Sequence, residues 1–363
     1  MKTSFISSLA MQNSMRNTIL KAQSEMVNLN TELTTGTHAD LGVALAANTA
    51  RSLDLHRDTN RITSILALNA IATQRLESSQ AALDSMAQAA QEIQQVLVSN
   101  SSSSEPTLTT VRTTISNALN NFTSFANTSV NGEFLFSGIN TDVKPLDDFM
   151  AEGSTLKEAY DRELNYFMSQ QVPPVISPEG LTKNQVETFL SDMEAKFNGT
   201  SLTTSPPHPV AGEDFWTAYA SSASDVNMTS RISQSEVVET STNSNSSGMR
   251  YFVMTAVTSM TFMVDAVDPA VREMVATKAI TNINFAISGI NQQQSKLGLS
   301  ESRVSKANDA LEAQKKIIDT HLTNIEGIDT YEAKTRLDLL QQQIEIAYSL
   351  TTRLQQMSLV NYL

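Results

Sequence analysis

Residues 55–97 read LHRDTNRITSILALNAIATQRLESSQAALDSMAQAAQEIQQVL. Within this stretch a mostly apolar or small position returns after alternating steps of three and four residues, at Leu55, Asp58, Ile62, Ile65, Asn69, Ala72, Leu76, Ser79, Leu83, Met86, Ala90, Ile93 and Leu97. This spacing predicts one narrow stripe along a helix of about six heptads, or ~63 Å. Such a stripe must pack against another long helix, and the other candidates lie near the C terminus. We therefore expect helices from the two chain ends to pair.

Asp58 and Asn69 are the charged and amide members of this stripe. A polar seam residue lowers stability but can fix the register of two helices. A position on the helix surface explains each of them equally well.

The two chain ends mirror each other. A helix over residues 15–33 ends at Gly36, where glycine can adopt the left-handed conformation that closes a helix. Near the other end, Asp268 and Pro269 begin a long helix, in which Gly298 indicates a bend. Gly327 breaks the pattern before a last helix, which Asp329 caps. The seam of the long C-terminal helix is predicted at Val304, Ala307, Leu311, Gln314, Ile318, His321 and Ile325.

The middle of the chain has a different composition. Seven of the nine prolines lie between residues 144 and 210, and the single tryptophan, Trp216, follows them. This predicts an insert with two short helices, over 156–168 and 184–197, among strands and loops. The apolar segment 134–136 after Gly132 predicts a strand or the start of a hairpin. Because proline-rich outward loops bury little backbone, we expect deletion of residues 201–212 to be tolerated.

These patterns together predict a mainly α fold. Long antiparallel helices from both chain ends form a coiled-coil rod, with an inserted α+β domain in the middle. Residues 1–40 with 328–363 form a terminal coiled-coil domain, 41–143 with 250–327 a helical rod domain, and 144–249 the insert.

Composition and charge exclude several classes of protein. The formal net charge is -13, and no run of Lys or Arg provides a phosphate-binding surface, so nucleic acid is not an expected partner. The chain has no cysteine, which excludes disulfides and thiol chemistry. No apolar run is long enough to span a membrane, so no membrane insertion is expected. The first twenty residues lack the features of a cleaved signal peptide, so the protein either stays inside the cell or leaves by a route that cuts no leader.

No set of residues indicates enzymatic chemistry. The histidines are isolated in sequence, and each is best interpreted as a surface or seam residue: His38, His56, His208 and His321. The neighbouring acids Asp147 and Asp148 are typical of a solvated face. We therefore expect no enzyme activity and no catalytic, cofactor-binding or metal-binding residues. The last ten residues are instead unusually apolar, which indicates burial against another chain.

Four segments resemble the flagellin superfamily. They are MKTSFISSL at residues 1–9, LTTG at 33–36, GEFLFSG at 132–138 and SLTTRLQQMSLVNYL at 349–363. The resemblance covers roughly 1–140 and 250–363. It implies an extracellular part of the bacterial flagellum, exported unfolded through the flagellum's own type III apparatus without a cleaved leader. It also implies that the terminal helices line an inner tube and that the insert faces outward.

The same resemblance implies the partners and the assembly interface. The partners are further copies of the chain in a ring, hook-associated protein 1 on the hook side, flagellin on the filament side and a flagellar export chaperone. No cofactor is implied. The expected interface residues are Phe5, Leu9, Met15, Ile19, Met26, Leu29, Leu33, Leu340, Ile344, Leu354, Met357, Leu359, Tyr362 and Leu363.

Three interpretations other than a ring of subunits between the hook and the filament remain open. Flagellin itself would use the same helices in an extended filament. An enzyme with its active site in the insert would bind a metal or substrate there, although no motif indicates one. An intracellular coiled-coil scaffold would not be found in the culture medium.

Overall fold

The computed structural model describes residues 8–102 and 107–360, which fold into two compact units. The first unit comprises the chain up to Ser64 and from Ala310 onward, and the second comprises Ile65–Asp309. The two units divide the chain at different residues from the three predicted domains, and they do not separate the insert from the rod. The predicted boundaries therefore stay a prediction.

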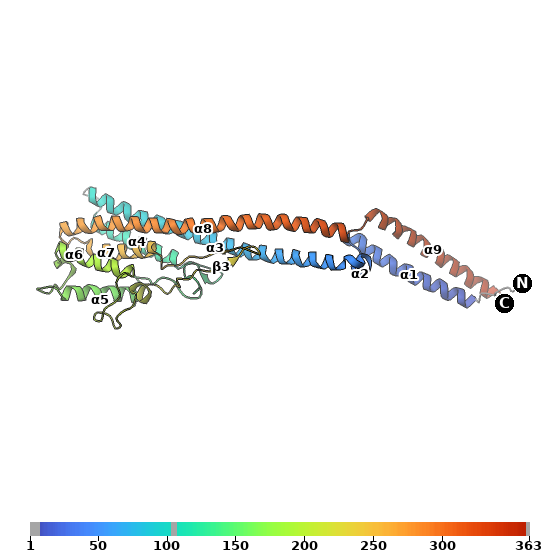
Figure 1. The fold of residues 1–363 in the computed structure, drawn as a ribbon, viewed down its shortest axis with the longest axis horizontal. Coiled ribbons are helices and arrows are strands. Elements are labelled where there is room, and N and C mark those ends of the chain that lie inside the picture. Colours follow the sequence, from blue (N-terminus) through green and yellow to red (C-terminus); the bar gives the residue numbers. More distant parts are fainter. Residues whose placement is uncertain (1–7, 103–106, 361–363) are drawn as a thin grey trace. The chain divides into compact units, whose positions relative to one another are not determined.

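The described chain is mainly helical, and its few strands are short (Figure 1). In chain order the elements are α1 (Ser8–Thr35), α2 (Leu41–Leu45), η1 (Ala46–Asn48), α3 (Thr49–Ser102), α4 (Leu108–Ala126), β1 (Ser129–Val130), β2 (Glu133–Phe134), α5 (Thr155–Ser169), η2 (Pro178–Gly180), α6 (Lys183–Phe197), the π-helical turn η3 (Trp216–Ala220), β3 (Thr229–Arg231), β4 (Val237–Glu239), α7 (Ser247–Phe262), α8 (Pro269–Glu326) and α9 (Thr330–Val360). The predicted fold class is confirmed, including both short helices of the insert.

The long helices α3 and α8 pair within the second unit as the sequence predicts. Gln80 donates from Nε2 to the backbone oxygen of Gln294 at 2.8 Å, and Gln94 donates to the side-chain oxygen of Asn284 at 2.6 Å. Residue numbers rise along one helix as they fall along the other, so the pair is antiparallel. Every predicted seam residue of α3 is buried, except Leu55, Asp58 and Ile65, which are half-buried.

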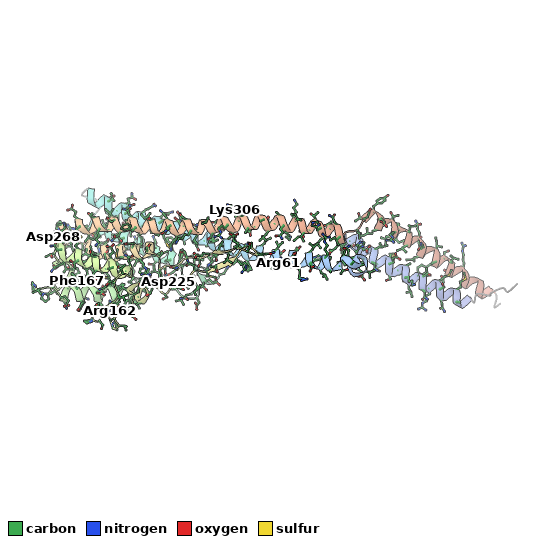
Figure 2. All side chains as sticks on the ribbon, viewed as in Figure 1. Arg61, Arg162, Phe167, Asp225, Asp268 and Lys306 are labelled. Carbon is green, nitrogen blue, oxygen red and sulfur yellow. The ribbon has the colours of Figure 1, made fainter. Side chains whose placement is uncertain are left out.

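The two polar seam residues of α3 differ. The carboxylate of Asp58 accepts from Arg61, one turn further along the same helix, at 3.0 Å, which is a surface pair. Arg61 is labelled in Figure 2. Asn69 is fully buried, and its Nδ2 donates to the backbone oxygen of Ile232 at 3.0 Å and to the side-chain oxygen of Asn308 at 2.7 Å. Only Asn69 therefore has the contacts of a residue that fixes register.

Helix α8 continues through Gly298, and the bend predicted there stays a prediction. The predicted seam of α8 is wrong at two positions, because Gln314 and His321 are exposed. Leu322 and Glu326 are buried instead. An undistorted helix has 3.6 residues per turn, so a stripe advanced by strict heptads drifts away from the buried face. Steps of four from Ile318 to Leu322 and Glu326 correct that drift.

The segment GEFLFSG forms part of a tight hairpin. Asn131 and Gly132 both have positive φ, 55° and 85°, which is the geometry of a two-residue turn between twisted strands. Arg75 of α3 holds this turn, donating to Glu133 Oε2 at 2.6 Å and to the backbone oxygen of Phe134 at 2.9 Å. Leu135 and Phe136, which follow β2, are fully buried. A hairpin is confirmed here, but it begins at β1, and of the predicted segment 134–136 only Phe134 lies in a strand.

One hydrophobic core continues through the second unit. It joins α3, α4, α7 and α8 to the insert helices α5 and α6, with Phe122 stacked on Phe252 at 3.8 Å between ring centroids. At the crossing of α7 and α8 the two backbones meet at Gly248 and Gly289. A Cβ on Gly248 would lie 2.7 Å from the backbone nitrogen of Ile290, so only glycine fits this crossing.

Candidate assembly surface

Helices α1 and α9 pack against each other in antiparallel order (Figure 1). Gln23 Nε2 donates to the Tyr348 hydroxyl at 3.0 Å. The buried centre of the pair is small and consists of Leu29, Ala333 and Leu337. Because so little apolar surface is buried, this helix pair gains much less from packing than the second unit does.

The structure brings together the predicted interface residues whose side chains it describes. Leu29 and Ile344 are buried, and the others are half-buried: Met15, Ile19, Met26, Leu33 and Leu340. Met26, Leu33 and Leu340 pack on the buried centre of the pair, so they face the other helix of the same chain. Leu9, Leu354, Met357 and Leu359 lie within α1 or α9. Phe5, Tyr362 and Leu363 lie outside the described residues.

A second set of apolar residues points away from the pair, and the sequence analysis missed it. We call this set the outer stripe, and it consists of one row on each helix: Leu20 (53% exposed) and Val27 (63%) on α1, and Leu339 (52%), Ile346 (60%) and Leu350 (43%) on α9. Leu20 and Val27 are seven residues apart on α1, as are Leu339 and Ile346 on α9, so each pair lies on one helix face. This spacing was the available signal. It was obscured because the intervening residues on these faces are polar.

A backbone bridge connects the ends of α1 and α8. Ile328 N donates to the oxygen of Gly36 at 3.1 Å, and His38 N donates to the oxygen of Glu326 at 3.0 Å. Gly36 has a φ of +76°, and a Cβ on Gly327 would lie 2.3 Å from the oxygen of Thr323. Both positions therefore require glycine. The predicted glycine-containing joint is confirmed at each chain end.

A buried carboxylate lies at this joint. Glu326 is 5% exposed, and its Oε1 accepts from Ser52 Oγ and lies 2.8 Å from His56 Nε2. On the next helix, Asp329 Oδ1 accepts from the backbone nitrogens of Tyr331 at 2.9 Å and Glu332 at 3.2 Å, as an N-cap does. These contacts fix where α8 ends and α9 begins.

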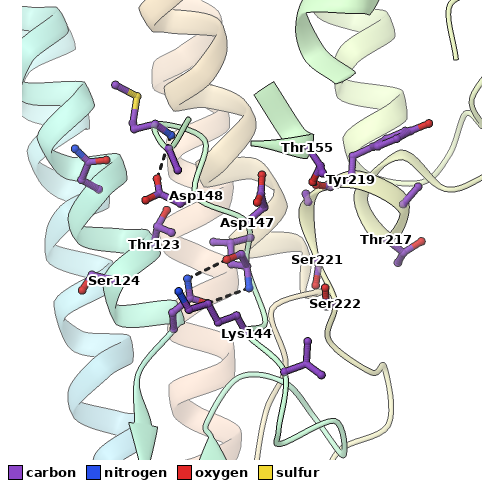
Figure 3. Close-up of a pocket in the computed structure, with 18 residues that line it drawn as sticks. Thr123, Ser124, Lys144, Asp147, Asp148, Thr155, Thr217, Tyr219, Ser221 and Ser222 are labelled. Carbon is purple, nitrogen blue, oxygen red and sulfur yellow. Dashed lines mark hydrogen bonds between the residues drawn. The ribbon is translucent and has the colours of Figure 1, made fainter. Parts of the chain in front are cut away.

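A polar groove of about 900 Å³ lies in the second unit, between α4, residues 143–151 and residues 217–222 (Figure 3). Its two carboxylates serve local structure. Asp147 Oδ2 accepts from Ser154 Oγ at 2.5 Å and from Leu156 N at 3.1 Å, and Asp148 Oδ1 accepts from Met150 N at 3.0 Å. Both carboxylates therefore organise the turn before α5, which is a role in folding rather than in chemistry.

Neither a metal site nor a membrane-spanning helix is present in the described residues. No cluster of three or more His, Asp or Glu side chains there could hold a metal ion. None of the helices in that part of the chain is long and apolar enough to cross a membrane.

His208 contradicts the interpretation of the histidines as surface or seam residues. Its side chain is fully buried in the insert, and its Nε2 lies 2.8 Å from Glu163 Oε1. Thr203, in the same proline-rich segment, is also buried. The other residues of 201–212 are mostly exposed, as the sequence predicts, so Thr203 and His208 are exceptions and the tolerance of a deletion there stays a prediction.

The long helices at both chain ends match known family models. Residues 6–141 match the bacterial flagellin N-terminal helical region, and residues 280–363 match the bacterial flagellin C-terminal helical region. Together the matches cover more than half of the chain. The chain belongs to the flagellin superfamily. This confirms the family that the four sequence segments indicate.

A solved structure described as a putative flagellar hook-associated protein from Vibrio parahaemolyticus is similar to 77% of this chain. The similarity covers 97% of that protein, with 11% sequence identity and a TM-score of 0.49. A comparison with curated protein sequences gives no match.

Membership in the flagellin superfamily carries general properties. The family is structural and non-enzymatic, and its members are exported to the flagellum and self-assemble into flagellar polymers. The chain therefore has a structural role in the flagellum. The surface that matters for such a role is one that contacts other subunits.

Proposed function

We propose that the chain is the hook-filament junction protein of a bacterial flagellum, also called hook-associated protein 3. A ring of its subunits adapts hook-associated protein 1 on the hook side to flagellin on the filament side. A flagellar export chaperone accompanies it before secretion through the flagellar type III route, without a cleaved leader.

The observation that carries this proposal is the outer stripe of α1 and α9. Its five side chains are 43–63% exposed on a helix pair whose inner face is already covered. Exposed apolar side chains at helical spacing on two neighbouring helices are typical of an interaction site. In a ring or helical array each subunit uses two different faces, so the stripe on one subunit meets a different face of the next.

The proposed roles of the domains follow from this assembly. Residues 1–40 with 328–363 line the inner tube, and the interface includes the predicted residues from Phe5 to Leu363 together with the outer stripe. Residues 41–143 with 250–327 form a helical layer around the tube, and residues 144–249 face outward.

The alternative is flagellin, which would use the same helices along the whole filament. The ending SLVNYL at residues 358–363 resembles junction proteins and favours the junction. Immunogold labelling of detached flagella distinguishes the two. The proposal expects label at one point near the hook, whereas label along the filament identifies flagellin. Absence of label from the flagella would contradict both.

A further inference from the structure

His208 joins four parts of the insert at one buried point. It is carried by the loop of residues 201–213, here called the proline loop, and its side chain is fully buried. Its ring lies on Tyr219 of η3 at 4.9 Å and meets the edge of Phe215 at 5.8 Å. Its Nε2 lies 2.8 Å from Glu163 Oε1 on α5. The other carboxylate oxygen of Glu163 pairs with Lys196 of α6 at 2.7 Å.

The charges around His208 favour a neutral imidazole. Glu163 is 4% exposed and already has a buried cation, because the side chain of Lys196 is only 6% exposed. Arg162 of α5, labelled in Figure 2, lies over the Tyr219 ring at 5.4 Å and adds a second positive charge. Asp192 of α6 pairs with Lys196 at 2.8 Å, but its carboxylate is 44% exposed and screened by solvent.

The second ring nitrogen of His208 makes protonation costly. Nδ1 is buried and has no hydrogen-bond partner, while Nε2 is directed at Glu163. A neutral ring with its proton on Nε2 donates to the carboxylate and leaves Nδ1 as a bare acceptor. A protonated ring would carry a buried N–H at Nδ1 with no acceptor, next to two cations. Unpaired buried donors and charges are strongly unfavourable.

The loop that carries His208 closes on itself. Thr203 N donates to the oxygen of Glu213 at 2.9 Å, and Gly212 N donates to the oxygen of Thr203 at 2.8 Å. His208 N donates to the oxygen of Thr204 at 3.0 Å. The loop is therefore a small closed unit whose buried histidine attaches it to α5 and η3 directly, and to α6 through Glu163 and Lys196.

We propose that the proline loop is an acid-released clasp, in which protonation of His208 withdraws its ring from the buried site between α5, α6 and η3 and opens the loop. The clasp lies in residues 65–309 and does not depend on the junction role. It would loosen the packing of the proline loop on α5 and η3 in acidic surroundings while α3, α4, α7 and α8 keep their packing.

The direction of the pH effect follows from linkage. Burial lowers the pKa of the His208 imidazole below its usual 6.5, the hydrogen bond and charge of Glu163 oppose this shift, and Arg162 and Lys196 add to it. The released loop has the usual pKa, so it binds a proton first as the pH falls. The clasp is therefore at full strength above 6.5 and weakens below it, until the pH reaches the folded pKa.

Hydrogen exchange of the full-length chain, read by mass spectrometry on peptides covering residues 200–213, tests the clasp. After correction for intrinsic exchange rates, protection of these amides should fall by about tenfold per pH unit between the released and folded pKa values. Peptides from α3 and α8 should keep their protection at about pH 5, where the released imidazole is largely charged. Protection of the proline loop that does not change between about pH 7.5 and pH 5 would overturn the proposal.

A matched pair of variants separates the clasp from general acid sensitivity. His208→Gln keeps an N–H donor toward Glu163 but does not titrate, so its loop protection should be independent of pH. His321→Gln removes an exposed histidine of α8 and should behave as the wild type does. Parallel loss of protection in wild type and His208→Gln would refute the idea. Should His208→Gln fail to fold, an NMR titration of the histidine rings in the wild-type chain replaces it, and a His208 pKa at or above 6.5 gives the same refutation.

Discussion

Asn69 of α3 donates from its side-chain amide to the side-chain oxygen of Asn308 of α8, 2.7 Å away, at a fully buried position of the seam. The same amide donates to the backbone oxygen of Ile232, next to β3. One residue therefore ties two long helices and a hairpin together. A shift of either helix by one turn would separate the two amides, so this contact specifies register.

We expect Asn69→Ala to lower the free energy of unfolding by about 1–3 kcal/mol, because it leaves the buried oxygen of Ile232 and the half-buried oxygen of Asn308 without their donor and opens a cavity. Asn60→Ala, on an exposed face of the same helix, is the control and should change it by less than about 0.5 kcal/mol. Urea denaturation measures both. A double-mutant cycle with Asn308→Ala should show coupling, and strictly additive losses would mean that the two amides do not interact.

The seam of α3 gives a second prediction. Leu83 is fully buried, so Leu83→Asp places a carboxylate in the core and should cost several kcal/mol, about 3–5. Asp84→Asn changes charge at the neighbouring exposed position and should leave the melting temperature nearly unchanged. Thermal melting compares the two variants. Equal midpoints would show that this face of α3 is not buried in solution.

Much of this architecture could be predicted because periodicity reports burial directly. The seam from Ile62 to Leu97 repeats without interruption, and two long helices with such seams have little choice but to pair. The prediction failed where the buried positions depart from the heptad spacing. His321 was placed by extending heptads, and the helix resolved the drift by burying Leu322.

The surface and the buried polar residues were harder to predict. Ile346 reads as one apolar residue among polar neighbours, and only the position of α1 shows that it faces away from the pair. His208 lies in a proline-rich segment that shows no periodic spacing of apolar residues. Its buried partner, Glu163, lies 45 residues earlier in the chain. The local sequence around His208 carries no sign of such a contact.

The first unit should open more easily than the second. The buried apolar residues described in the α1 and α9 pair are few, and two of them are alanines: Ala22, Leu29, Ala333, Leu337 and Ile344. Ordering a backbone costs about 1–2 kcal/mol per residue. In limited proteolysis of the free subunit we expect the first cuts within 8–35 and 330–360, followed by a stable fragment that contains residues 65–309. Cleavage of the second unit at the same rate would contradict this order of stability.

The outer stripe gives the prediction that bears most directly on function. Ile346 is 60% exposed, so Ile346→Asp should change the stability of the free subunit by no more than about 0.5 kcal/mol. The new carboxylate would nevertheless enter every contact between neighbouring subunits, because one face repeats around the whole assembly. Burial of an unpaired charge at each contact should abolish the junction. Cells with this variant should make hooks without filaments and release flagellin into the medium.

Gln341→Asp is the matched control for charge, because it adds a carboxylate at an exposed position of α9 that lies five residues away and faces a different side of the helix. This variant should keep normal filaments. Electron microscopy of both strains, with flagellin measured in the medium, separates the outcomes. Normal filaments with Ile346→Asp would show that the outer stripe is not an assembly contact. Loss of filaments in both strains would indicate that any added negative charge on α9 prevents export or assembly. The outer stripe would then not be a specific assembly contact.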